Sequence, residues 1–94
     1  MNNLFDLTGK TALITGGGGL LGPKHAEAII EYGGKVILAD WHEDRAREKS
    51  ELINNTYGGG ASYEYMDVTD KSSVQSVVDK YDKIDILINN AAKD

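Results

Sequence analysis

The sequence predicts an α/β fold in three layers, with helices on both faces of a parallel sheet. Strand-like segments alternate with helix-like segments along the chain, and the glycine-rich run from Thr15 to Gly22 joins the first strand to the first helix. An acidic residue, Asp40, closes the second strand. Alternation of this kind gives a parallel sheet with right-handed crossovers, because each helix returns the chain to the same edge of the sheet.

The expected order is strand, helix, strand, helix, strand, helix, strand, over residues 11–15, 23–32, 35–39, 43–54, 62–66, 71–81 and 84–89. The first strand is a short apolar run. Pro23 suits the first position of a helix, where its missing N–H costs nothing. Ala26, Ile29 and Ile30 share one face of that helix, and Gly33 ends it. A β-branched, apolar strand follows.

The second helix carries Glu43 and Asp44 in its first turn, where the helix dipole favours negative charge. Its apolar stripe is thin, so we expect an outer helix, followed by a loop over 54–60. Asp70 is the expected N-cap of the third helix. That helix has the clearest amphipathic stripe of the chain, formed by Val74, Val77, Val78 and Tyr81. The last strand, 84–89, is apolar enough to be covered on both faces.

Length, charge and composition limit the class of protein. The 94 residues suffice for one domain, and the net charge of −5 argues against nucleic acid and against an anionic membrane surface as partners. No apolar run approaches the roughly 20 residues of a membrane span. The chain has no cysteine, and His25 and His42 have no second ligand at metal spacing, so no metal site is expected. We expect a cytoplasmic protein without an export signal.

The glycine-rich turn carries the strongest functional signal, because it lies between a strand and a helix. In that context it predicts backbone N–H groups that meet a pyrophosphate at the positive end of the helix. Gly16 would make the tight turn, Gly19 would let the backbone approach the phosphates, and Gly22 would let the helix pack close to the sheet. Gly18 is expected only to add conformational freedom to the backbone of the turn. The predicted contact residues are Gly16, Gly18, Gly19, Leu20, Leu21 and Gly22.

Two alternatives to a dinucleotide site are disfavoured by the residues around this turn. A P-loop needs Lys and Ser or Thr directly after its last glycine, and here Pro23 follows Gly22. A methyltransferase of similar topology usually has an acidic residue just before the glycines, where this chain has Thr15. The turn therefore favours a dinucleotide.

Asp40 lies about 20 residues after the turn, where an acidic side chain binds the ribose hydroxyls of adenosine. A carboxylate there also repels a 2′-phosphate, which predicts NAD rather than NADP as the cofactor. The alternative is that Asp40 merely caps the second helix. Trp41 either borders the adenine pocket or covers the edge of that helix.

Three motifs in order resemble the N-terminal, dinucleotide-binding half of the short-chain dehydrogenase/reductase family. They are Thr15 to Gly22, Asp67-Val68, and Asn89-Asn90-Ala91-Ala92. The resemblance spans about residues 5–94 and implies a Rossmann-type sheet of four strands in the order 3-2-1-4 with three crossover helices, incomplete relative to the family. Leu20 and Ala92 stand where the family's main branch has glycine.

The resemblance also implies further contacts with the cofactor. It places Asp67 and Val68 against the adenine ring, the alternative for Asp67 being a turn residue before the third helix. It places Asn90, Ala91 and Ala92 under the cofactor ribose. Asn89 is expected to be structural, bonding neighbouring strands.

The resemblance implies an NAD-dependent oxidoreductase that transfers hydride between nicotinamide and a carbonyl or alcohol substrate. The run Gly17 to Leu21 resembles members that act on sugars or sugar nucleotides. The family's catalytic Ser and Tyr-x-x-x-Lys are absent, because none of the five tyrosines has lysine four residues later. We therefore expect residues 1–94 to be one partial NAD-binding domain, inactive alone, of an enzyme that is a homo-oligomer when complete. The alternative is a non-catalytic module that binds NAD or another adenine nucleotide.

Overall fold

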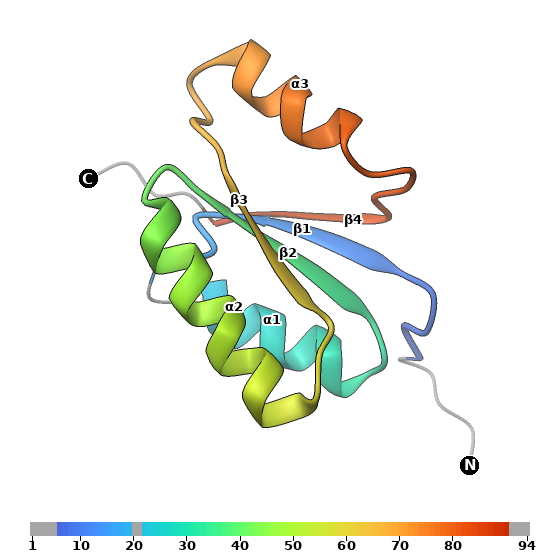
Figure 1. Ribbon diagram of the computed structural model, residues 1–94. Coiled ribbons are helices and arrows are strands. Elements are labelled where there is room, and N and C mark those ends of the chain that lie inside the picture. The colour runs from blue at the N-terminus through green and yellow to red at the C-terminus, as the bar shows by residue number, and fades with distance from the viewer. Residues whose placement is uncertain (1–5, 20–21, 91–94) are drawn as a thin grey trace.

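Figure 1 shows a computed structural model of the chain, which describes residues 6–19 and 22–90. Its elements follow the predicted order: β1 Thr11–Thr15, α1 Gly22–Glu31, β2 Lys35–Asp40, α2 Glu43–Tyr57, β3 Ala61–Tyr65, α3 Lys71–Asp79 and β4 Ile86–Asn89. The strands form one parallel sheet in the order β3-β2-β1-β4. The predicted fold class and strand order are confirmed.

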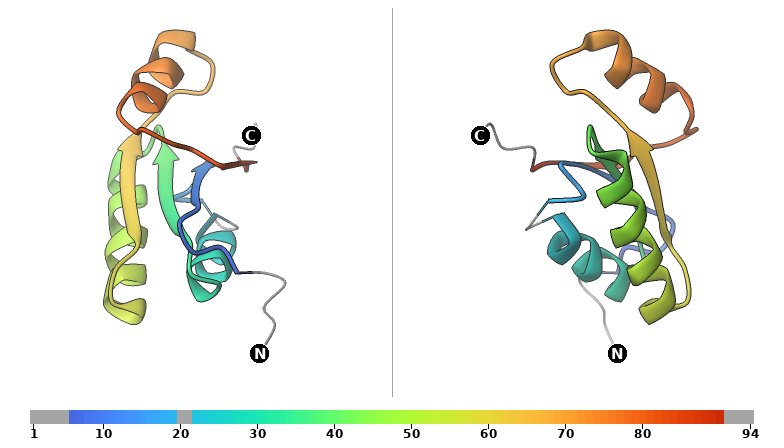
Figure 2. Two further views of the ribbon diagram at one scale, coloured as in Figure 1. Left: turned by 90° about the vertical axis from the view of Figure 1, so that its right-hand side faces the viewer. Right: turned by 60° about the vertical axis from the view of Figure 1, so that its left-hand side comes forward.

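The helices divide unequally between the two faces of the sheet. Helices α1 and α2 cover one face and α3 lies over the other, as the views in Figures 1 and 2 agree. Between the sheet and the first two helices lies the larger apolar core, formed by Ala12, Ile14, Ala26, Ile29, Val36, Leu38, Ala46 and Ile53. Small alanines where the helices meet the sheet let both helices approach it closely.

The α3 face has a smaller core. Leu13, Ile37 and Ala39 point to this side, because side chains alternate along a strand, and they pack with Met66 and Val77. The central strands β1 and β2 are therefore buried on both faces, as in other parallel sheets.

The expectation that the last strand is covered on both faces is wrong. Strand β4 begins at Ile86, and Leu87 is 65% exposed. Leu87 is the register partner of Leu13 and so points to the α3 side. The core on that side reaches β1 but does not extend over β4, so this apolar side chain remains at the surface.

The second helix is longer than the sequence predicts, because it continues through residues 54–57. Its end is fixed by Gly58, whose backbone lies in the left-handed region at φ 82° and whose N–H donates to the carbonyl of Asn54 at 2.8 Å. The side chain of Asn54 also makes two hydrogen bonds. Its amide nitrogen donates to the carbonyl of Ala61 and its oxygen accepts from the N–H of Ala61, both at 2.9 Å. This asparagine joins the end of α2 to the start of β3.

Helix α3 begins where the sequence predicts and ends two residues early. Asp70 is its N-cap and accepts from the Ser72 N–H at 3.0 Å. Of the predicted stripe, Val77 is buried and Val74 is partly buried, whereas Val78 is exposed. The stripe thus faces the sheet along one narrow line.

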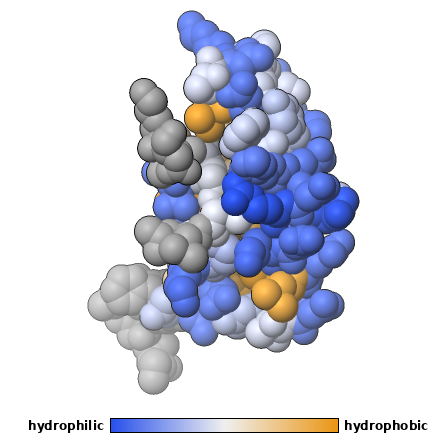
Figure 3. Space-filling view, turned by 90° about the vertical axis from the view of Figure 1, so that its left-hand side faces the viewer, coloured by the Kyte–Doolittle hydropathy of each residue, from blue (hydrophilic) through white to orange (hydrophobic). Residues whose placement is uncertain are grey.

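The outer side of α2 meets solvent. Leu52 is exposed, whereas the polar Ser50 is buried with Ala46 and Ile53 on the inner side of the helix. Figure 3 shows this side of the molecule, which is hydrophilic over most of its area with small, separate hydrophobic patches. Within the described ranges, no helix combines the length and apolar character that crossing a membrane requires.

Candidate functional site

The predicted site residues come together at one edge of the sheet. In a parallel sheet, the carboxyl ends of all strands lie at the same edge, which is where ligands bind in open α/β folds. The glycine turn follows β1, Asp40 closes β2, Asp67 follows β3 and Asn90 follows β4. Leu20, Leu21, Ala91 and Ala92 lie outside the described residues.

The glycine turn is held tightly against the sheet. The Gly17 N–H donates to the carbonyl of Ala39 in β2 at 3.0 Å, and the Gly19 N–H donates to the carbonyl of Gly16 at 3.0 Å. Gly16 lies at φ 68°, a left-handed conformation that favours glycine. The tight turn predicted at Gly16 is therefore present.

Close approach, rather than freedom, explains the glycines at positions 18 and 22. A Cβ on Gly18 would lie 2.8 Å from the backbone nitrogen of Ala46 in α2, closer than real contacts allow. A Cβ on Gly22 would lie 2.7 Å from the Cα of Gly17. The sequence alone suggested only freedom for Gly18, because nothing local shows that α2 begins directly beside the turn.

Asp40 lies between the turn and the start of α2, and it is only 5% exposed. Its Oδ2 accepts from the Gly18 N–H at 3.0 Å, and its Oδ1 accepts from the His42 N–H at 2.9 Å. An ionised carboxylate has about four lone-pair positions, so each oxygen can accept one more hydrogen bond. Both oxygens of Asp40 therefore keep acceptor capacity beyond these two hydrogen bonds.

Two large apolar side chains are exposed where β2 and β3 end. Trp41 is 66% exposed, and its ring lies against the ring of His42 with centroids 4.2 Å apart at 48°. Val68, after the neighbouring strand β3, is 47% exposed. Large exposed apolar side chains at a ligand-binding edge suit the flat face of an aromatic base.

Asp67 forms a turn before α3, which was the alternative left open by its sequence. Its Oδ1 accepts from the Thr69 hydroxyl at 2.7 Å and from the Thr69 N–H at 3.0 Å. Its own N–H donates to the Ser73 hydroxyl at 2.9 Å. These bonds fix the loop that presents Val68.

The end of β4 is tied to the end of β1, and the predicted structural role of Asn89 is confirmed. The Thr15 hydroxyl donates to Oδ1 of Asn89 at 2.9 Å. The Asn90 N–H donates to the Thr15 carbonyl at 3.1 Å, and its side-chain amide donates to the Gly16 carbonyl at 3.4 Å. Asn90 therefore supports the glycine turn from the side of β4.

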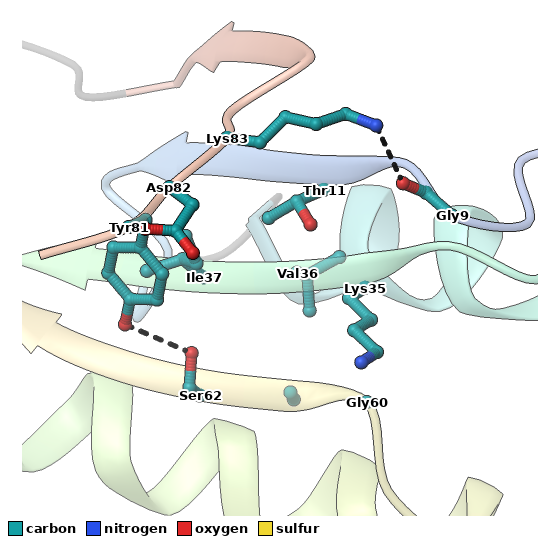
Figure 4. A pocket seen from close by; sticks show the side chains of 11 residues that line it. Gly9, Thr11, Lys35, Val36, Ile37, Gly60, Ser62, Tyr81, Asp82 and Lys83 are labelled. Carbon is teal, nitrogen blue, oxygen red and sulfur yellow. Dashed lines mark hydrogen bonds between the residues drawn. The ribbon is translucent and has the colours of Figure 1, made fainter. Parts of the chain in front are cut away.

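A hollow of about 570 Å³ lies far from these residues, at the amino ends of the strands. Figure 4 shows Tyr81, Asp82 and Lys83 above it and the starts of β2 and β3 below it. None of the predicted site residues that the structure describes lines it. The hollow is therefore separate from the predicted dinucleotide site.

Sequence reasoning missed a polar cluster beside this hollow. Glu64 accepts from the Lys80 ammonium and from the Tyr81 hydroxyl, both at 2.7 Å, and the Tyr81 hydroxyl lies 3.4 Å from that of Ser62. Burial raises the pKa of Tyr81, the opposite of what a tyrosine that abstracts protons needs. These residues lie up to 19 positions apart, and no local pattern would reveal them. The cluster fastens the end of α3 to β3.

Lys80 belongs to the same polar cluster. The hydrogen bond to Glu64 raises the pKa of Lys80, which keeps the ammonium charged.

No cluster of three or more potential metal ligands occurs among the residues that the structure describes.

Comparisons with known proteins agree with this geometry. The family model described as short chain dehydrogenase matches residues 10–93. A short chain dehydrogenase/reductase, dpmpG of Macrophomina phaseolina, is 37% identical over 91 residues, which cover 93% of this chain and 52% of that protein. The chain thus spans about half the length of this relative.

Solved structures of similar proteins superpose closely. A short-chain type dehydrogenase/reductase from Mycobacterium marinum is 38% identical with a TM-score of 0.82, over 89% of this chain and 35% of the other. The RhlG/NADP active-site complex of Pseudomonas aeruginosa is 25% identical with a TM-score of 0.85, over 99% of this chain and 38% of the other. Proteins of this kind use nicotinamide dinucleotides, NAD or NADP. The chain belongs to the short-chain dehydrogenase/reductase family of oxidoreductases.

Proposed function

We propose that the carboxyl edge of this sheet binds NAD and forms the dinucleotide-binding part of an oxidoreductase. The observation that carries the proposal is the buried carboxylate of Asp40, held by two backbone N–H groups with acceptor capacity to spare. Two adjacent ribose hydroxyls match the remaining lone pairs. The closely packed glycine turn fits a pyrophosphate, which needs bare backbone next to the start of a helix.

The other predicted site residues have roles in the same proposed site. Trp41 and Val68 supply apolar surface for the adenine ring, and the turn fixed by Asp67 presents that surface. Asn90 lies beside the turn, where the resemblance places the ribose, and Ala91 and Ala92 follow it in the chain. These residues would bind and orient NAD, which would supply the hydride chemistry when bound.

Charge favours NAD over NADP. A 2′-phosphate would bring its negative charge next to the carboxylate of Asp40 at the end of β2. Like charges at such short range disfavour binding. The nearby cation Arg45 is exposed to solvent, which screens its attraction for a phosphate. We expect NAD to bind at least about tenfold more tightly, which corresponds to about 1.4 kcal/mol.

The test is a titration of the chain with NADH and NADPH, followed by the fluorescence of its single tryptophan, Trp41, and by calorimetry. Asp40→Ala should weaken NAD binding and reduce the preference for NAD. The matched control is Asp44→Ala, which removes the same charge from an exposed position four residues away. Equal or tighter binding of NADPH by the unmutated chain would refute the assignment of NAD.

The proposed reaction is hydride transfer between nicotinamide and a carbonyl or alcohol, with a sugar-linked substrate suggested by the glycine turn. Within residues 1–94, no tyrosine is followed by lysine at the fourth position, so we propose that these residues bind the cofactor without turning it over. This observation also favours the second candidate, a non-catalytic module that binds NAD or another adenine nucleotide. Turnover of NADH by the full natural chain with simple aldehydes and ketones separates the two candidates. We expect the active form to be a homo-oligomer.

A further inference from the structure

We propose that Asp40 is also a positioning residue for the glycine turn, so that one carboxylate orders both the ribose end and the pyrophosphate end of the site. The inference rests on the proposed function, because it describes how the same NAD site is built. It predicts that losing the Asp40 carboxylate weakens binding even of a dinucleotide that has no hydroxyl to offer it.

The contacts of Gly18 carry the inference. Its N–H donates to Oδ2 of Asp40 across 22 positions of the chain, and Oδ1 of the same side chain accepts from the N–H of His42 at the start of α2. The carboxylate therefore bridges the middle of the turn and the helix that follows β2. Burial strengthens such bonds, because water cannot compete for them.

Other parts of the turn have their own attachments. Gly17 is bonded to the backbone of Ala39, and the carbonyl of Gly16 accepts from the Asn90 side chain. Both bonds hold the first half of the turn and involve no part of Asp40. The middle of the turn is the part that the Asp40 carboxylate holds, and it is the part that lies against α2 at Ala46.

A double-mutant cycle with the ligand separates the two roles of Asp40. The affinities of the full natural chain and of Asp40→Ala are measured for NAD and for its analogue with 2′,3′-dideoxyadenosine. If the carboxylate only binds ribose, the mutation has no effect on the dideoxy analogue. We expect it to weaken the analogue by about tenfold or more, the factor that one hydrogen bond to a charged group commonly contributes. Asp44→Asn, which removes a charge from the exposed first turn of α2, should leave both affinities unchanged.

Amide hydrogen exchange in the unliganded chain gives an independent test. In Asp40→Ala the Gly18 amide should exchange at least about tenfold faster, while the Gly17 amide keeps its protection. Asp40→Asn keeps one side-chain oxygen and should restore part of the protection of Gly18, which a general loss of stability would not do.

The outcomes are distinguishable. Two results would overturn the positioning role while leaving the proposed binding of NAD intact. One is unchanged exchange of the Gly18 amide in Asp40→Ala. The other is equal affinity of Asp40→Ala and the unmutated chain for the dideoxy analogue. Failure of the unmutated chain to bind NAD overturns the proposed function, and the exchange rates then still decide whether Asp40 holds the turn.

Discussion

Asn54 offers the sharpest test of how the packing of this fold is held. Its carboxamide makes two hydrogen bonds to the backbone of Ala61, at 2.9 Å each, and so joins the last turn of α2 to the first residue of β3. Asn54→Ala removes both bonds and leaves the helix otherwise intact. Asn55→Ala is the matched control, because Asn55 is the exposed neighbour in the same turn of the same helix.

The expected loss follows from the count of bonds. A hydrogen bond within a protein contributes a net 0.5–1.5 kcal/mol, so two bonds together contribute about 1–3 kcal/mol. Replacing asparagine by alanine in a helix returns up to about 0.7 kcal/mol through helix propensity, and this gain applies to both variants. The difference between the two variants should therefore be about 1–3 kcal/mol, with Asn54→Ala the less stable.

Thermal and urea unfolding followed by circular dichroism measure this difference. In a domain of this size, each kcal/mol shifts the melting temperature by about 4–8 °C. Equal melting temperatures of the two variants would refute the reasoning, because they would mean that the bonds to Ala61 contribute no stability beyond solvation of the same groups.

Three further predictions concern the turn, the third helix and the sheet edge. Gly16→Val should abolish NAD binding measured by calorimetry, because a β-branched residue is strained at φ 68°; normal binding would place the phosphate cradle elsewhere. The Ser72 hydroxyl and N–H lower the pKa of Asp70 below its ordinary 3.8, so its contribution to α3 is full above pH 3.8 and is lost as the pH falls further. Asp70→Asn should lack this part of the acid transition in circular dichroism, and an identical transition would contradict the assignment. Residues 1–94 should self-associate, because β4 is an edge strand and carries the exposed apolar side chain of Leu87. Leu87→Lys should reduce this association in sedimentation velocity, and a monomeric unmutated chain or an unchanged association would contradict the prediction.

The sequence was sufficient to predict the order of the helices and strands and the edge of the sheet where the candidate site lies. Both depend on local patterns: the apolar runs of the strands, the amphipathic spacing that buries Val77, and the cap formed by Asp70. The position of Asp40 beside the glycine turn follows from strand order alone, because β1 and β2 are neighbours in register.

What the sequence missed depends on contacts between distant segments. Asn54 looked like the start of a loop, because its partner Ala61 lies beyond the helix end. Leu87 looked buried, because an apolar pattern shows that a strand can be covered and not how far a neighbouring helix extends. The packing of Gly18 against Ala46 and its bond to Asp40 require both the turn and α2 to be placed in three dimensions.

The close packing at Gly18 and Gly22 has a consequence for how such chains evolve. A side chain at either position would collide with the protein's own backbone, with or without a ligand. A descendant that stopped using dinucleotides would therefore remain under selection to keep these glycines, since replacing them would damage the fold itself. These glycines would therefore be kept for folding alone. Trp41 is mostly exposed to solvent, so the fold itself does not require it and it could be replaced in a chain that no longer binds a ligand. Under the role proposed for Trp41 at the adenine ring, position 41 should distinguish descendants that still bind a nucleotide better than the glycines do.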